Sequence, residues 1–252
     1  MKKGYFVLKY ILITFLILQT NFLLIKGQYQ QVYDILTPNT STVSDTYEYT
    51  GNEPTYSEAE VENMRQNLWN NYGHAELLAI PSPSYNCHAY AWHVSEGGRL
   101  VWIGKYTIIA EDIYWDDYSY YEVTSESNAT KVSYPELGNH SAITTEQNEW
   151  YISKWGSNVL ARHKWDEVPS IYFPDDPDYD LLTFYAPSNP SDTKYIEDFT
   201  FKAGVYINGN KIKAKDIIID IDNIGWVTFE ASNYVLIEKN FEVTLGSTFE
   251  IK

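Results

Sequence analysis

The sequence predicts an α+β fold, in which a helix bearing a cysteine packs on an antiparallel sheet bearing a histidine, followed by a small all-β unit. Three observations predict it. Two helix-forming segments come first, and a series of strand-like runs follows them, which is the order typical of an α+β domain. After Tyr195 the pattern changes to short alternating β runs. The 252 residues suffice for one large or two smaller domains.

Residues 1–27 have the pattern of a secretory signal. Lys2 and Lys3 form a basic start, an apolar run extends from Tyr10 to Ile25, and Gly27 is a small residue after which cleavage can occur. A retained membrane anchor is the alternative, because the apolar run is somewhat long. We therefore expect a secreted or cell-envelope protein whose mature form has no membrane contact.

Charge and cysteine content narrow the classes of partner. Removing residues 1–27 takes away four lysines and no acid, so the formal charge changes from −16 to −20. Such a charge repels phosphate backbones, and nucleic acid is excluded as a partner. The single cysteine, Cys87, forms no intramolecular disulfide. A lone thiol in an exported protein is either buried and inert or retained for its chemistry.

The first helix is predicted at Ser57. Residues 28–56 before it are rich in Thr, Ser, Tyr, Asn and Pro without apolar periodicity, and we expect a flexible or loosely docked arm. Ser57 and Glu60 have the spacing of a capping box, and apolar residues then recur near a 3.6 period up to Asn71. The residues 81–84, Pro-Ser-Pro-Ser, end the next element, and Cys87 begins a segment of good helix formers.

The middle of the chain reads as helix plus loop over 104–123, followed by strands. Breaks rich in Pro and Asp at 174–178 and 187–192 then limit this first domain to 57–186. The expected strands are residues 131–134, 140–145, 150–155 and 171–173.

Residues 195–252 are predicted to form a separate all-β domain. Residues 200–203, 228–231 and 248–251 resemble degenerate copies of one unit, which favours a small sandwich or a solenoid-like stack. Such a unit would serve attachment or binding to a surface or another protein. The expected short runs are residues 199–203, 217–219, 227–231, 235–237, 241–243 and 248–251.

Cys87 is the candidate nucleophile. Thiol hydrolysis of an amide needs a thiolate, a base within hydrogen-bond reach, a group that orients the base, and N–H donors for the oxyanion. A helix start lowers a thiol pKa and offers free N–H groups. The alternative is a small buried cysteine inside a helix.

His140 is the candidate base among five histidines. It stands at the start of a predicted strand about fifty residues after Cys87, where a sheet-borne base can meet a helix-borne nucleophile. His88 adjoins the cysteine but points away from it on a helix, so its expected role is structural or as an oxyanion neighbour. His74 and His93 are surface candidates.

Three sequence blocks carry a family resemblance: Tyr-Asn-Cys-His-Ala-Tyr-Ala-Trp at 85–92, Asn-His-Ser-Ala-Ile at 139–143, and Ile-Ser-Lys-Trp-Gly at 152–156. Over roughly 57–173 they resemble the papain-like superfamily of CHAP and NlpC/P60 cysteine amidases, and an uncharacterised group of exported bacterial proteins. The resemblance implies that Cys87 is the nucleophile, His140 the base and Ser153 the orienting residue. Serine orients a base more weakly than His, Asn or Asp, so His163 is the substitute candidate. The expected oxyanion and pocket residues are Tyr85, Asn86, His88 and Trp92.

The resulting prediction is an exported cysteine amidase or peptidase that acts through a Cys87 acyl-enzyme on a peptide, a cell-wall peptide or a small amide. The alternative is a catalytically weak or inactive scaffold that acts as a surface binding module. We predict no cofactor and no metal, because one cysteine with scattered histidines does not make a zinc site. The acidic residues 175–180 lack the glycine and terminal glutamate of a calcium loop.

Overall fold

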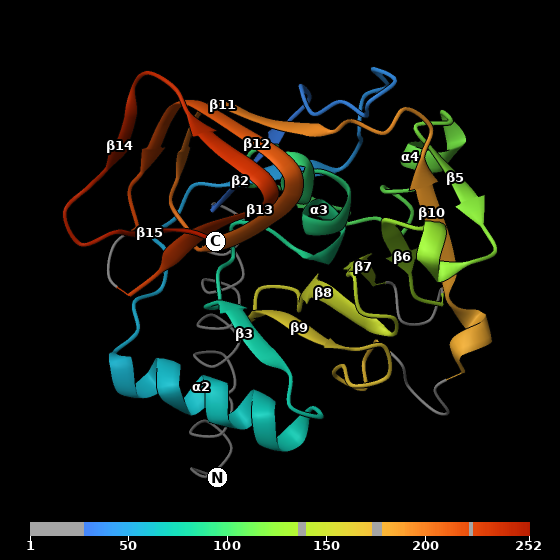
Figure 1. Ribbon diagram of the computed structural model, residues 1–252, viewed down its shortest axis with the longest axis horizontal. Helices are drawn as coiled ribbons and strands as arrows, with labels where there is room; N and C mark the ends of the chain where they lie inside the picture. Colours follow the sequence, from blue (N-terminus) through green and yellow to red (C-terminus); the bar gives the residue numbers. More distant parts are fainter. Residues whose placement is uncertain (1–27, 136–139, 173–177, 222–223) are drawn as a thin grey trace, which may run out of the picture.

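The computed structural model describes residues 28–135, 140–172, 178–221 and 224–252, so the predicted signal at 1–27 lies outside the described residues. The molecule is mostly β, with 40% strand and 15% helix arranged as three sheets with short helices (Figure 1). The predicted α+β class, a papain-like domain with its helix packed on one sheet, is therefore wrong. The prediction gave the short helical segments too much weight and omitted several strands.

The helix predicted at Ser57 is present. Helix α2 spans Glu58–Asn71, the Ser57 side chain accepts the Glu60 amide, and the Glu60 side chain accepts the Ser57 amide, as in a capping box. Val61 and Leu68 are its buried residues. The other helical segments are α3 (Cys87–Trp92), η1 (Val94–Glu96), α4 (Ile113–Asp116), η2 (Glu126–Asn128) and η3 (Tyr179–Leu181).

The segment 28–56 is not a flexible arm. Strands β1 (Tyr29–Val32) and β2 (Thr46–Tyr49) pair antiparallel, and β2 pairs with β4 (Trp102–Ile103), which makes a three-stranded sheet. Ile35 and Val43 between β1 and β2 are buried in the main core. The alternation of apolar residues here is too short to produce a visible period in the sequence.

The second sheet is antiparallel and has the strand order β3-β9-β8-β7-β6-β10-β5. The strands predicted at 131–134, 140–145 and 150–155 are confirmed as β6, β7 and β8. Residues 171 and 172 lie in a turn instead of a strand. The strand bounds are β3 Glu76–Ala79, β5 Tyr120–Val123, β6 Lys131–Ser133, β7 Ser141–Thr144, β8 Trp150–Lys154, β9 Leu160–Lys164 and β10 Thr183–Pro187.

The C-terminal sheet is parallel throughout. Thr193 pairs with Lys211, Val205 with Val227, and Trp226 with Thr248, so each strand stacks on a later one at a similar offset along the chain, as in a solenoid. The Phe of each degenerate copy forms a column, with Phe201 and Phe229 centroids 6.2 Å apart and those of Phe229 and Phe249 5.0 Å apart. The strands are β11 Thr193–Phe201, β12 Val205–Ile219, β13 Trp226–Ile237, β14 Phe241–Val243 and β15 Thr248–Ile251.

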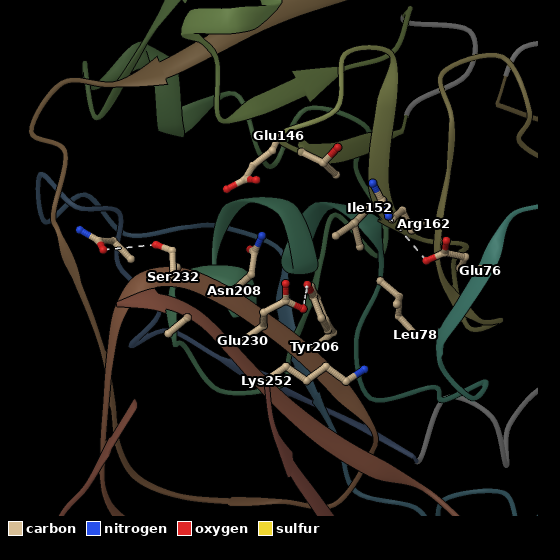
Figure 2. A pocket seen from close by; sticks show the side chains of 14 residues that line it. Glu76, Leu78, Glu146, Ile152, Arg162, Tyr206, Asn208, Glu230, Ser232 and Lys252 are labelled. Atoms are coloured by element: carbon tan, nitrogen blue, oxygen red, sulfur yellow. Dashed lines mark hydrogen bonds and ion pairs between the residues drawn. The ribbon is translucent and has the colours of Figure 1, made fainter. Parts of the chain in front are cut away.

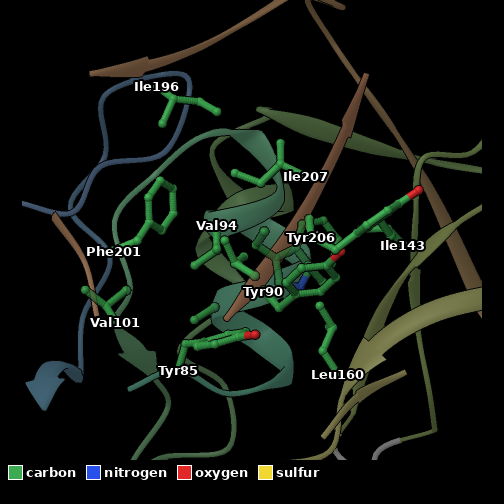
Figure 3. Packing of buried hydrophobic residues seen from close by; sticks show 14 of the residues in the cluster. Tyr85, Tyr90, Val94, Val101, Ile143, Leu160, Ile196, Phe201, Tyr206 and Ile207 are labelled. Atoms are coloured by element: carbon green, nitrogen blue, oxygen red, sulfur yellow. Dashed lines mark hydrogen bonds between the residues drawn. The ribbon is translucent and has the colours of Figure 1, made fainter. Parts of the chain in front are cut away.

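One hydrophobic cluster joins the C-terminal sheet to the rest of the molecule. Helix α3 lies between the C-terminal sheet and strands β7 and β8 (Figure 1). Tyr85 donates its hydroxyl to the Gly204 carbonyl at 2.8 Å, and Tyr90 donates to the Tyr206 carbonyl at 3.0 Å. Figure 3 shows both tyrosines beside side chains from the antiparallel and parallel sheets. The division into domains at 57–186 and 195–252 stays a prediction.

Candidate functional site

The start of α3 is fixed by its cap. Asn86 has extended backbone angles, and its side-chain oxygen accepts the amides of Ala89 at 3.1 Å and Ile103 at 3.2 Å. Its side-chain nitrogen donates to the Ile103 carbonyl at 2.7 Å. The predicted placement of Cys87 at the first position of a helix is therefore confirmed, and Asn86 is engaged in holding the helix start against β4.

The segment before the cap is held by a buried lysine. Lys154 donates to the carbonyls of Ser82 at 2.9 Å, Gly156 at 2.8 Å and Asn158, so all three of its N–H groups have acceptors. Burial lowers the pKa of Lys154 to about 7. The Cys87 thiol lies close enough to this ammonium for an electrostatic interaction between them. Lys154 is thus held in a fixed position near the thiol, and near neutral pH about half of it carries a charge.

The Cys87 thiol is itself 4% exposed and receives a hydrogen bond from the Ser141 backbone amide. Burial raises the pKa of this thiol to about 12, and the amide hydrogen bonds at the helix start offset only part of the rise. The helix start does lower the thiol pKa, as expected, but burial has the larger effect and the net shift is upward. The resting state contains a protonated thiol, because a six-residue helix cannot compensate for the loss of water.

His140 is next to the residue that contacts the thiol. Its ring is 1% exposed and stacks on Tyr172 with centroids 3.9 Å apart and planes 16° apart, while Tyr134 meets it edge-on at 5.0 Å. Neither ring nitrogen of His140 has a hydrogen-bond partner in the described part of the chain. Burial, together with the nearby His163 and His88, lowers the pKa of His140 well below 6.5 and keeps the ring neutral.

Ser153 has a partner other than His140. Its hydroxyl lies 2.7 Å from His163 Nε2, and Trp155 Nε1 donates to it at 3.1 Å. His163 Nδ1 lies 2.7 Å from the Lys164 carbonyl, which can only accept, so Nδ1 carries the proton and Ser153 donates to Nε2. The structure does not place Ser153 or His163 in hydrogen-bond contact with His140. Aromatic stacking on Tyr172 orients the His140 ring instead.

The other predicted pocket residues have structural partners. His88 Nδ1 lies 3.0 Å from Ser141 Oγ and 3.0 Å from Glu111 Oε1, and Trp92 Nε1 donates to the same Ser141 hydroxyl at 3.1 Å. Tyr85 is buried completely against the C-terminal sheet. These side chains brace α3 on the sheet, which leaves the backbone amides at its start as the only predicted oxyanion donors.

Sequence reasoning missed several residues of this site. Tyr172 was assigned to a strand, although its position in a turn lets its ring cover His140. Lys154 belongs to the Ile-Ser-Lys-Trp-Gly block at 152–156, but no role was predicted for it. Glu53 lies in the segment 28–56 that was expected to be flexible. Its carboxylate accepts a hydrogen bond from the Ser84 hydroxyl just before α3. The sequence held one signal for these contacts: Lys154 lies in a segment with the pattern of a buried strand. Because an unpaired buried lysine is rare, such a lysine is expected to have polar partners.

Comparison with known proteins gives no match to a family model, to a curated protein or to a solved structure. The papain-like resemblance therefore stays an expectation from three sequence blocks. Within the described ranges, no three His, Cys, Asp or Glu side chains are grouped to hold a metal ion. No helix among these residues is both long and apolar enough to span a membrane.

Proposed function

We propose that the chain is an exported cysteine hydrolase that cleaves an amide bond through Cys87, with His140 as its base. One observation carries the proposal: His140 is a buried imidazole without a hydrogen-bond partner among the described residues, beside the residue whose amide binds the Cys87 thiol. An unsatisfied buried polar group costs about 1–3 kcal/mol. A protein retains such a group where it has a use, and a neutral imidazole is the form that accepts a proton.

The proposed reaction has two steps. His140 removes the thiol proton of Cys87 as the sulfur attacks the amide carbon, and the imidazolium then protonates the leaving amine, so that a thioester forms and the C–N bond breaks. Water hydrolyses the thioester with His140 again acting as base, which returns the thiol. Backbone amides at the start of α3 would bind the oxyanion, and the protonated form of Lys154 would favour the anionic species on this path.

The binding-module alternative is favoured by the same burial. Among the residues that the structure describes, no hydrogen bond joins the Cys87 thiol to either ring nitrogen of His140, and a thiol with a pKa near 12 is unreactive at rest. Catalysis therefore requires that a substrate, by entering, brings a polar environment to the thiol. If no substrate does this, the buried Cys87 and His140 serve packing alone.

A substrate-like alkylating probe separates the two functions. We expect a peptide carrying a C-terminal vinyl sulfone to form a thioether with Cys87, as detected by the mass of the intact chain and of its peptides. Cys87→Ala should abolish modification, and His140→Asn should lower its rate at least about tenfold. His74→Asn is the matched control, because His74 is exposed and meets Trp69 edge-on at the surface. Equal modification of the His140→Asn variant and the unchanged chain would sink the enzyme proposal.

A further inference from the structure

Two lysines share one glutamate at a cavity between the antiparallel sheet and the C-terminal sheet. The cavity is about 260 Å³ and its lining includes Glu96, Lys131 and Lys194. Lys131 Nζ contacts Glu96 Oε1, and Lys194 Nζ lies 3.5 Å from the same oxygen. The Lys131 side chain is 2% exposed, that of Lys194 17% and that of Glu96 37%. Two cations facing one carboxylate leave one unit of positive charge, in a chain whose net charge is −16.

Each ammonium retains donor capacity. Lys131 Nζ donates to Ser95 Oγ at 3.0 Å and to Glu96, and Lys194 Nζ donates to the Ser95 carbonyl at 2.6 Å and weakly to Glu96. An ammonium has three N–H groups, so within the described part of the chain each lysine has one N–H group left for a ligand.

The local field is positive. Burial alone would raise the pKa of Glu96, but the two ammonium groups outweigh burial and lower it to about 2. Burial lowers the pKa of Lys131 to about 8; the Glu96 carboxylate raises it, and the neighbouring Lys194 lowers it to a smaller extent. A second anion entering the cavity would relieve the repulsion between the two lysines.

The cavity has a larger neighbour. A cavity of about 510 Å³ shares Asn208 and Gly209 of β12 with the smaller cavity, and the next residues of the β7 segment, Thr145 and Glu146, line it. Figure 2 shows Glu146 and Glu230 on opposite sides of this larger cavity, with Tyr206 hydrogen-bonded to Glu230 at 2.7 Å. The lysines thus line a cavity that borders a larger one with both polar and apolar lining residues.

We propose that Lys131 and Lys194 bind the carboxylate end of a short peptide whose chain extends along β12 into the larger cavity. A single excess positive charge matches a carboxylate, whereas a doubly charged phosphate would leave a negative charge uncompensated in a half-buried space. The two neighbouring cavities of about 260 and 510 Å³ share lining residues of β12, which suits a ligand with a body of several residues better than a lone acetate ion. This site is separate from Cys87 and does not depend on the proposed hydrolase activity.

Calorimetric titration of the whole chain with N-acetyl-trialanine tests the proposal, with its C-terminal amide, acetate and inorganic phosphate as comparison ligands. We expect the free acid to bind and the amide to bind at least about tenfold more weakly, since the charge-assisted hydrogen bonds are lost. If acetate binds as tightly as the peptide, the site binds a carboxylate without contacting a peptide body, and the assignment of a peptide ligand is overturned. Preferential binding of phosphate, or equal binding of acid and amide, would overturn the proposal as a whole.

Variants then assign the site. Lys194→Gln should weaken binding of the free acid about tenfold, and Glu96→Gln should strengthen it several-fold, because removing the competing carboxylate leaves two cations for the ligand. Lys131 is buried, and Lys131→Met can therefore fail to fold. The test does not depend on that variant, because Lys194→Gln and Glu96→Gln change binding in opposite directions. Lys211→Gln is the matched control, since Lys211 pairs with Asp192 outside both cavities and should bind as the unchanged chain does. Weaker binding by Glu96→Gln would contradict the assignment.

Discussion

Ser153 donates its hydroxyl proton to Nε2 of His163 across 2.7 Å, and His163 in turn donates from Nδ1 to the Lys164 carbonyl. The serine that the sequence predicts as the orienting residue of His140 therefore serves a different histidine. Both residues are buried completely on the face of the sheet that also holds Trp155. A substitution in this pair should therefore change the free energy of unfolding without changing the chemistry at Cys87.

The first prediction concerns Ser153→Ala. The change leaves His163 Nε2 and Trp155 Nε1 without partners in a buried place, so we expect a loss of about 1–3 kcal/mol in the free energy of unfolding, measured with urea. Modification of Cys87 by the vinyl sulfone probe should proceed at an unchanged rate. Ser133→Ala is the control, because the Ser133 hydroxyl makes only one long contact of 3.5 Å, to the Tyr134 carbonyl, among the described residues. A large loss of modification with intact stability would return Ser153 to an orienting role.

The second prediction concerns acid stability through His163. Burial lowers the pKa of His163 from 6.5 to about 4, so the folded state binds fewer protons than the unfolded state between these values. The contribution of neutral His163 to the free energy of unfolding is fully present above pH 6.5 and is lost as the pH falls toward 4. At about 1.4 kcal/mol per pKa unit, the loss is about 3 kcal/mol. His163→Gln should flatten the fall in unfolding free energy over this range, and an unchanged slope would show that other groups cause it.

How far the sequence predicted the structure depended on whether the signal was local. The capping box at Ser57 and the start of a helix at Cys87 were predicted because each rests on neighbouring residues. The degenerate copies containing Phe201, Phe229 and Phe249 correctly indicated stacked strands. The pairing of β1 with β2, the turn that brings Tyr172 over His140, and the burial of Cys87 depend on contacts distant in sequence, which periodicity does not report.

The third prediction concerns the contact of α3 with the C-terminal sheet. Tyr90→Phe removes the hydroxyl that satisfies the Tyr206 carbonyl, and Tyr85→Phe does the same at Gly204, so each should cost about 1–3 kcal/mol. Because these tyrosines pack in one core with both sheets, we expect the loss in a single unfolding transition seen by tryptophan fluorescence and by circular dichroism. Tyr33→Phe, at an exposed tyrosine, is the control.

Limited proteolysis gives the complementary result. The sequence places a domain boundary between Pro174 and Tyr195, where a protease should cut and leave two stable pieces. The shared core argues that pieces cut there stay associated and unfold together. Separation of two independently folded pieces on a sizing column, without denaturant, would establish the division at 186–195 despite the contacts of α3.

The last prediction concerns the reactivity of Cys87 itself. Because burial raises the pKa of the thiol to about 12, the thiolate fraction in the folded chain is very small at pH 7. We expect labelling by iodoacetamide to be slow at pH 7 and to increase about tenfold with each pH unit up to about pH 10, since only the thiolate reacts. In urea the same residue should label with the ordinary thiol pKa of about 8.5. His140→Gln should leave this profile unchanged, because the resting thiol and imidazole are both neutral and no ion pair is lost.

Cys87→Ser provides the blank for labelling at other side chains. A rate that is already maximal below pH 8 in the folded chain, and that falls in His140→Gln, would show that Cys87 and His140 form a thiolate–imidazolium pair. In that event burial does not govern the thiol, and the site is catalytically poised without a substrate.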